Sequence, residues 1–124
     1  MTFIESLKND KNIILKKCAS PAPEILITDQ ECIHIAIVDT ETTGIDKLND
    51  KIIEIAIKSI DMDKTTGEIL SIKDQYESYN DPEVEIANEI TLLTGIDNNM
   101  VFESSIDWDT VDLIFEKVDL NSLP

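Results

Sequence analysis

Residues 37–45 read IVDTETTGI, and this stretch places two acids at the end of an apolar run. Asp39 and Glu41 are separated by one residue and are followed by a Thr-Thr-Gly turn. Residues i and i+2 of a β-strand point to the same face, so a strand that continues through Thr40 directs both carboxylates to one side. Two adjacent carboxylates repel each other, and a bound divalent cation reverses that penalty. The spacing predicts a metal site, although D-x-E by itself is more often a solvated loop end.

The composition describes a small, strongly acidic chain. It has 124 residues, of which 42% are hydrophobic, and this predicts one domain with a modest core. The formal net charge is -16, and all ten basic residues are Lys. A protein that grips nucleic acid through its phosphates needs a basic face and favours Arg, so the composition argues against that mode of binding. Nucleic acid remains open as a substrate, because divalent metals can bridge acidic protein and phosphate.

The N-terminal half gives few signs of export or membrane insertion. Cys18 and Cys32 lack metal-ligand spacing, and we expect reduced thiols in a cytoplasmic protein, with a disulfide between them as the alternative. Residues 1–17 lack the apolar core and cleavage site of a secretory signal. No apolar run approaches the length that spans a bilayer, so no membrane partner is expected.

Three strands and two helices are expected in the order β-β-β-α-α. The strands cover residues 32–41, 51–62 and 68–80, and the short turns between them predict an antiparallel meander. Residues 32–41 are apolar on both faces, which is typical of a central strand covered on both sides. Residues 68–80 are more polar and are expected nearer an edge of the sheet.

The two helices follow the strands. The apolar spacing of residues 85–93 predicts a helix, and Gly95 suits the position just after its end. The second helix is expected to begin at Asp107 as its N-cap, because an apolar stripe with helical spacing follows. We expect this stripe to lie in the core: Trp108, Val111, Ile114, Phe115 and Val118.

The longer string IVDTETTGID resembles the first motif of the DnaQ-like, DEDD-type 3′–5′ exonucleases. Residues 50–56 resemble the second strand of that family. Residues 82–101 resemble the segment in which a helix ends in a Thr-Gly-Ile turn, and residues 106–119 resemble the helix that leads into the second motif. The resemblance covers residues 33–119 in one consistent order, which makes chance a poor explanation. It implies an α/β, RNase H-like fold, present here in part.

The resemblance also implies roles for particular residues. Asp39 and Glu41 match the first two metal-binding acids and are the implied catalytic residues. Glu54 matches a common position in the second strand, and we do not assign it as a ligand. The turn formed by Thr42, Thr43 and Gly44 is implied to lie against the 3′-terminal nucleotide. The turn formed by Thr94, Gly95 and Ile96 is implied to lie near the terminal base.

Members of the family hydrolyse a terminal phosphodiester with two metal ions, Mg²⁺ or Mn²⁺. One metal activates the attacking water, and the other stabilises the leaving oxygen. The reaction needs four carboxylates and a His or Tyr that takes the proton of the water. Residues 97–124 contain neither the H-N-x-x-F-D pattern of the second motif nor the third motif.

No residue of the chain replaces the missing groups convincingly. His34 lies five positions before Asp39, so a regular strand puts it on the opposite face, as a packed or hydrogen-bonded histidine. Asp107, Asp109 and Asp112 fall at the start of the second helix, where negative charge is favourable without a metal.

Two interpretations follow from this comparison. In the first, residues 1–31 are an extension and residues 32–124 are the N-terminal part of a 3′–5′ exonuclease domain that binds a single-stranded 3′ end of DNA or RNA, as a truncated or split enzyme. In the second, the chain is a non-catalytic interaction module that needs a partner, either a complementing chain or a DNA polymerase assembly. Both predict an uncovered sheet edge, exposed apolar surface and self-association.

Overall fold

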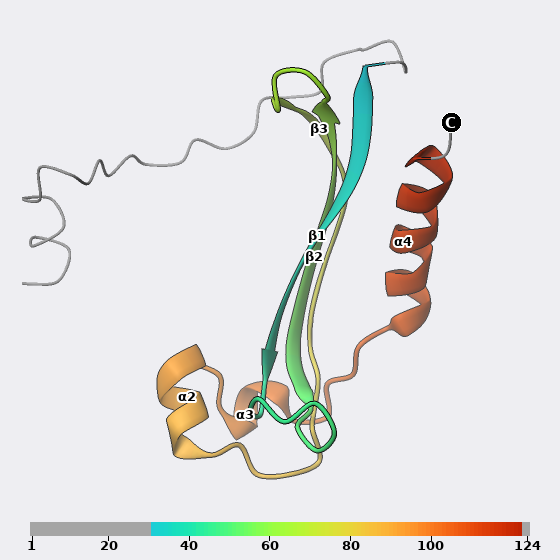
Figure 1. Ribbon diagram of the computed structural model, residues 1–124. Helices are drawn as coiled ribbons and strands as arrows, with labels where there is room; N and C mark the ends of the chain where they lie inside the picture. Colours follow the sequence, from blue (N-terminus) through green and yellow to red (C-terminus); the bar gives the residue numbers. More distant parts are fainter. Residues whose placement is uncertain (1–30, 123–124) are drawn as a thin grey trace, which may run out of the picture.

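The computed structural model describes residues 31–122, which form one antiparallel sheet with helices at one end and along one face (Figure 1). The strands are β1 (Cys32–Thr42), β2 (Ile52–Asp63) and β3 (Ile69–Tyr79), in the spatial order β1-β2-β3. Both strand pairs are antiparallel, so the predicted meander is confirmed. Nearly all of the proposed extension, residues 1–31, lies outside the described residues, as does Cys18.

The central strand is β2, not the strand that the sequence favoured. Ile53, Ile55 and Ile57 of β2 are at most 3% exposed. β1 lies at an edge of the sheet, and its Ile37 and Val38 are 50% and 44% exposed. The expectation that residues 32–41 are covered on both sides is wrong for the described residues. Apolar content shows what a strand can bury, whereas burial depends on the elements that pack against it.

The turn between β2 and β3 is held by one carboxylate. Oδ1 of Asp63 accepts hydrogen bonds from the backbone N–H groups of Thr65 (2.7 Å) and Thr66 (2.8 Å). The backbone N–H of Gly67 donates to the carbonyl of Asp63 at 3.0 Å, which closes the turn. The bonds from Thr66 and Thr65 to the carboxylate lower the pKa of Asp63, with the backbone bond from Thr66 as the largest cause. The predicted turn at residues 63–67 is confirmed.

The described residues contain three helices: α2 (Asn88–Thr94), α3 (Asn98–Val101) and α4 (Trp108–Ser122). Gly95 ends α2 with a φ of 79°, a left-handed conformation that glycine adopts at no steric cost. The short helix α3 was not expected. It begins at Asp97, whose Oδ1 accepts a hydrogen bond from the backbone N–H of Met100 at 3.0 Å.

Asp107 caps α4, as the sequence predicts. Its Oδ1 accepts hydrogen bonds from the backbone N–H groups of Asp109 (3.1 Å) and Thr110 (3.2 Å). The backbone N–H of Asp107 donates to the hydroxyl of Tyr76 on β3 at 2.8 Å. This bond fixes the start of the helix to the sheet. The rest of α4 then lies beside the sheet (Figure 1).

Two apolar clusters hold these elements together. The first joins α4 to one face of the sheet through Ile55, Ile57, Ile106, Val111 and Ile114. The second joins the segment containing α2 and α3 to the start of β2 through Ile53, Ile86, Ile96 and Val101.

The predicted apolar stripe of α4 is only partly in the core. Val111 and Ile114 are each 3% exposed, but Trp108 is 51% and Phe115 is 36% exposed. The apolar stripe of α4 is wider than the surface that the three strands bury, so the side chains of Trp108 and Phe115 remain exposed to solvent. Together with Ile37, Val38 and Leu113, they confirm the predicted exposed apolar surface. None of the helices within residues 31–122 is long and apolar enough to cross a membrane.

Replacement of Ile53 by Ala tests the second cluster. Ile53 is fully buried, so the loss of its side chain should lower the free energy of unfolding by roughly 2–5 kcal/mol in urea denaturation. Ile45→Ala is the control, since Ile45 is fully exposed and should change stability by less than about 0.5 kcal/mol. Equal effects of the two substitutions would contradict the packing described here.

Candidate active site

The strand register places the two acids of β1 together on the face that α4 leaves open. Asp39 pairs with Ala56, and Glu41 pairs directly with Glu54 of β2. Ala56 in turn pairs with Glu77 of β3. Directly paired residues lie on one face of a sheet, so all four acids point to the same side. Ile55 and Ile57, which contact α4, point to the other side.

The electrostatics of this face show a concentration of negative charge. Burial raises the pKa of Glu54, and the carboxylates of Glu77, Glu41 and Asp39 raise it further. Like charges directly opposite each other in a strand pair are destabilising. Described residues of β2 and β3 therefore extend the carboxylate pair of β1 into a cluster that favours a cation. Glu77 was not found from the sequence, although the alternation of β3 puts it on this face.

The chain changes direction immediately after Glu41. The β1–β2 register shifts between Glu41 and Thr42, which is a bulge at the end of the strand pair. The hydroxyl of Thr42 donates to the carbonyl of Gly44 at 2.6 Å. The backbone N–H of Thr43 donates to the carbonyl of Lys51 at 2.9 Å. The N–H of Thr43 is thus engaged by a backbone hydrogen bond just beyond the strand pair and is not directed to a substrate phosphate.

Asp50 organises the same turn and was missed in the sequence. Its Oδ1 accepts a hydrogen bond from the hydroxyl of Thr43 (2.9 Å), and its Oδ2 accepts one from the backbone N–H of Asp46 (2.7 Å). A Cβ atom on Gly44 would lie 2.4–2.9 Å from the Asp50 carboxylate. A side chain at position 44 would therefore displace the Asp50 carboxylate, and the turn motif that contains Gly44 was the available signal in the sequence. The turn is a folded unit that supports Glu41.

The second predicted substrate turn, residues 94–96, ends α2. The hydroxyl of Thr94 donates to the carbonyl of Ile90 at 2.9 Å, and the backbone N–H of Ile96 donates to the same hydroxyl oxygen at 3.1 Å. Ile96 is 3% exposed and packs with Ile53 in the second cluster. Its side chain therefore supports the turn from the core, and Gly95 is the exposed residue of the three.

Two polar residues after β3 connect this turn region to the sheet, and their role could not be predicted from their position at the end of a strand. The side-chain amide of Asn80 donates to the carbonyl of Ile52 at 3.0 Å. Asp81 accepts hydrogen bonds from the backbone N–H groups of Glu83 (2.8 Å) and Glu103 (3.0 Å). With the second cluster, these bonds hold the segment containing α2 and α3 against the start of β2, near Glu54. Figure 1 shows both helices at the end of the sheet where β1 finishes.

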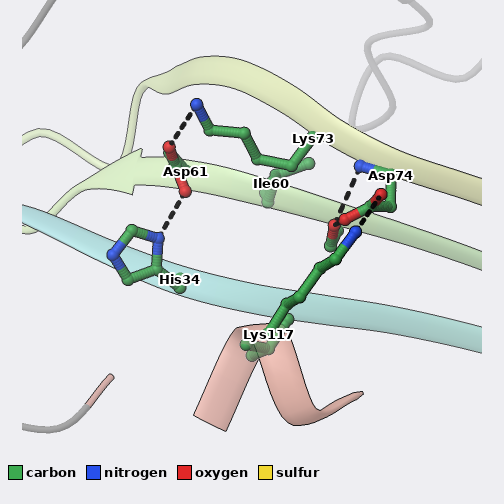
Figure 2. Close-up of a pocket in the computed structure, with 8 residues that line it drawn as sticks. His34, Ile60, Asp61, Lys73, Asp74 and Lys117 are labelled. Atoms are coloured by element: carbon green, nitrogen blue, oxygen red, sulfur yellow. Dashed lines mark hydrogen bonds and ion pairs between the residues drawn. The ribbon is translucent and has the colours of Figure 1, made fainter. Parts of the chain in front are cut away.

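His34 lies on the opposite face, as its position predicts. Its Nδ1 is 2.5 Å from Oδ1 of Asp61, its direct partner in β2. Lys73 lies 3.2 Å from the other carboxylate oxygen of Asp61, and Figure 2 shows His34 and Lys73 reaching Asp61 from neighbouring strands. Burial alone would raise the pKa of Asp61, but the hydrogen bonds and charges of His34 and Lys73 outweigh it, so the pKa is lowered. His34 is a hydrogen-bonded strand histidine and does not face Asp39.

The donor set on the open face fits a hard divalent cation. Asp39 and Glu41 offer carboxylate oxygens, and Mg²⁺ in proteins commonly takes one or two carboxylates with water and substrate phosphate. Glu54 and Glu77 add negative charge from the adjacent strands. A hollow of about 410 Å³ lies beside Glu77, with Ile37, Ala56 and Lys58 among its other lining residues.

Comparison with known proteins identifies this arrangement. The profile described as Exonuclease (RNase_T) matches residues 36–106, which include Asp39, Glu41, Glu54 and the 94–96 turn. The chain belongs to the exonuclease family. The proposed resemblance to DnaQ-like exonucleases is thereby confirmed, and exonucleases of this kind depend on divalent metals.

Two relatives are DNA polymerases III of the PolC type. The one from Caldanaerobacter subterraneus subsp. tengcongensis is 39% identical over 73 residues, which are 59% of this chain and 5% of that protein. The one from Clostridium perfringens is 47% identical over 66 residues, which are 52% of this chain and 4% of that protein. The chain thus spans about one-twentieth of the length of these relatives.

A solved structure supports the fold. The structure described as "3'-end specific recognition of histone mRNA stem-loop by 3'-exonuclease" superposes with a TM-score of 0.51 at 23% identity. The match covers 77% of this chain and 43% of that one. The α/β exonuclease fold is therefore confirmed as a partial one: a three-stranded antiparallel sheet with three helices in the described residues.

Glu54→Gln tests the electrostatics of this face. The folded-state pKa of Glu54 lies above its ordinary value of 4.5, so its ionisation disfavours the folded state as pH rises above 4.5. The substitution should raise stability at pH 7 by roughly 0.2–1 kcal/mol, and the gain should disappear below pH 4.5. Urea denaturation at several pH values measures this. The control is Glu68→Gln, which removes an exposed acid just after the 63–67 turn and should change little. A gain for Glu54→Gln that does not depend on pH would contradict the explanation.

Proposed function

We propose that this chain provides the first half of the active site of a 3′–5′ exonuclease that removes nucleotides from a single-stranded 3′ end, as the N-terminal part of the domain in residues 32–124. The observation that carries the proposal is the pairing of Asp39 and Glu41 on the open face beside Glu54. Family membership supports the reaction class, and the two PolC-type relatives favour DNA as the substrate and a polymerase assembly as the context. A cytoplasmic location agrees with this role.

Mg²⁺ or Mn²⁺ is the cofactor that we propose for Asp39 and Glu41. When bound, such an ion lowers the pKa of a water molecule and stabilises negative charge on the phosphate. Asp39 and Glu41 would hold the ion at the strand end, and Glu54 would add negative charge across the strand pair. Thr42, Thr43 and Gly44 set the direction of the chain after Glu41. Thr94 and Gly95 belong to a second turn, whose Ile96 packs on Ile53, the neighbour of Glu54 in β2.

Mn²⁺ binding can be measured residue by residue in the isolated chain. A paramagnetic ion at Asp39 and Glu41 should broaden the backbone NMR signals of residues 38–42 first. Two carboxylates form an incomplete ligand set, so we expect a dissociation constant of about 1 mM. Asp39→Ala should abolish the selective broadening. Asp112→Ala removes the same charge from an exposed position of α4 and should leave it unchanged. Equal broadening in both variants would show that Asp39 is not a ligand of the ion.

A second candidate function is supported by the surface of the sheet. β1 is an edge strand with exposed Ile37 and Val38, and α4 exposes Trp108, Leu113 and Phe115. An edge strand with apolar side chains is a template for pairing with another chain. This feature favours an interaction module that is completed by a partner, and it leads to the predicted self-association when the partner is missing.

Reconstitution distinguishes the two functions. The chain should degrade single-stranded DNA in Mn²⁺ only when a fragment carrying the next two motifs of a PolC-type exonuclease is added. Light scattering should show self-association without the fragment, and Val38→Lys should reduce it by placing a charge at the edge. Activity that requires Asp39 in the reconstituted mixture supports the exonuclease. A fragment that binds this chain and gives no Asp39-dependent activity would leave the interaction module as the function.

A further inference from the structure

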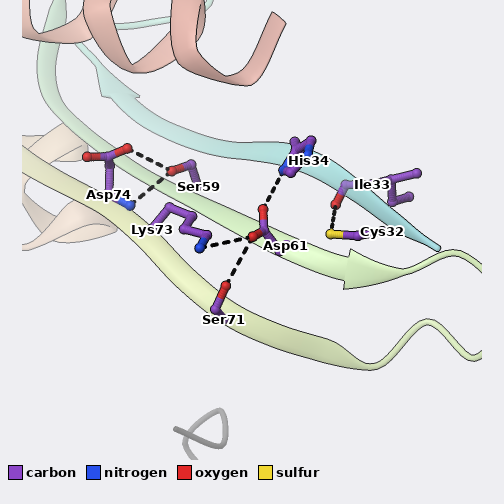
Figure 3. A network of polar contacts seen from close by, with 8 residues as sticks. All are labelled: Cys32, Ile33, His34, Ser59, Asp61, Ser71, Lys73 and Asp74. Atoms are coloured by element: carbon purple, nitrogen blue, oxygen red, sulfur yellow. Dashed lines mark hydrogen bonds and ion pairs between the residues drawn. The ribbon is translucent and has the colours of Figure 1, made fainter. Parts of the chain in front are cut away.

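Cys32, His34 and Asp61 lie together at the end of the sheet remote from the acidic face. Cys32 and His34 are separated by one residue at the start of β1, so they share a face, and Asp61 is the direct partner of His34 in β2. Figure 3 shows the three residues at this end of the strand pair. His34 and Asp39 are five positions apart, which is about 17 Å along the strand, and they point to opposite faces. The cluster is separate from the exonuclease site in position and in direction.

The three side chains offer a sulfur, a nitrogen and an oxygen ligand atom, all within 4.8 Å of one another. Zinc bonds of about 2.0–2.3 Å in a tetrahedron put ligand atoms about 3.3–3.8 Å apart. The cluster is close to this arrangement, and the approach of Nδ1 to Oδ1 at 2.5 Å is the contact that must open. All three residues are half-buried, which shields such a centre from bulk water.

The surroundings already orient the carboxylate. Oδ2 of Asp61 accepts a hydrogen bond from the hydroxyl of Ser71 at 3.2 Å and lies 3.2 Å from Nζ of Lys73. Oδ1 is the atom that faces the imidazole. Groups that hydrogen-bond to a metal-binding side chain and hold its orientation raise the affinity of a metal site, and the hydroxyl of Ser71 is such a group. The Lys73 ammonium opposes a cation, but its contact is with the oxygen that does not face His34.

The geometry points to a Zn²⁺ site formed by Cys32, His34 and Asp61, with water as the fourth ligand. A thiolate and an imidazole select Zn²⁺ over Mg²⁺, whereas the carboxylates of the acidic face favour Mg²⁺ or Mn²⁺. The chain would thus carry two cation sites that differ in ligand chemistry. Cys18 and Cys32 lack metal-ligand spacing, whereas Cys32 and His34 are separated by one residue in a single strand, and this Cys-x-His spacing was the missed signal.

A metal at this site would connect β1 to β2 near the start of β1. His34 and Cys32 belong to the edge strand, and Asp61 belongs to the central strand. Binding to the folded state alone stabilises that state, because the unfolded chain does not hold the three ligands together. Zn²⁺ should therefore raise the melting temperature of the chain.

Co²⁺ provides a direct test because a cysteine thiolate bound to Co²⁺ absorbs in the near ultraviolet. The full chain, kept reduced, is titrated with Co²⁺ and then with Zn²⁺. We expect a thiolate band that saturates at one equivalent and is lost when Zn²⁺ displaces Co²⁺. Cys32→Ser and His34→Ala should each weaken Co²⁺ binding about 10-fold or more. Cys18→Ser is the matched control, and it should leave the band intact.

Further variants separate this site from the exonuclease site and from misfolding. Asp39→Ala should retain the thiolate band, so failure of the exonuclease proposal would not affect this result. Circular dichroism checks that each variant is folded. The titration of the wild-type chain tests the proposal even if a variant does not fold. The absence of a thiolate band in the wild type would overturn the proposal. So would a band that disappears in Cys18→Ser or persists at full strength in Cys32→Ser.

Discussion

The antiparallel register of β1 and β2 is the constraint on which the rest of the structure depends. It pairs Asp39 with Ala56 and Glu41 with Glu54, so the acids share a face that α4 does not cover. A slip of one residue would turn every side chain of β1 to the other face and would place the acids under the helix. The register is maintained by the buried face of β2, where Ile55 and Ile57 contact α4, and it ends in the bulge after Glu41. The position of the active-site acids thus follows from hydrophobic packing on the opposite side of the sheet.

Much of this could be predicted from local sequence. The three strands, the 63–67 turn, the Gly95 terminus and the Asp107 cap each depend on residues within a few positions of one another, and each is confirmed. The incorrect predictions concern which elements of the fold cover a given strand or helix face. β1 has the composition of a covered strand and lies at an edge, and Trp108 has the spacing of a core residue and is half exposed. Periodicity reports the face that a segment can bury, and it carries no information about the element that does the burying.

The site was predictable to the same extent. Asp39 and Glu41 follow from strand alternation, because both belong to one strand. Glu77 joins them through the β2–β3 register, and Asp50 reaches Gly44 across the loop. Contacts of this kind arise from pairing between distant segments, and a single sequence does not specify such pairings. The same limit applies to His34 and Asp61, which are 27 residues apart in sequence.

The central claim is that Asp39 and Glu41 form a cation site on the open face of the sheet. Crystals grown with Mn²⁺ and measured at wavelengths where manganese scatters anomalously test it most directly, since the ion is located without reference to the rest of the structure. The account predicts an anomalous peak within about 2.5 Å of carboxylate oxygens of Asp39 and Glu41, on the face opposite α4. A structure in which Mn²⁺ binds elsewhere, or in which Glu41 points toward α4, would contradict it.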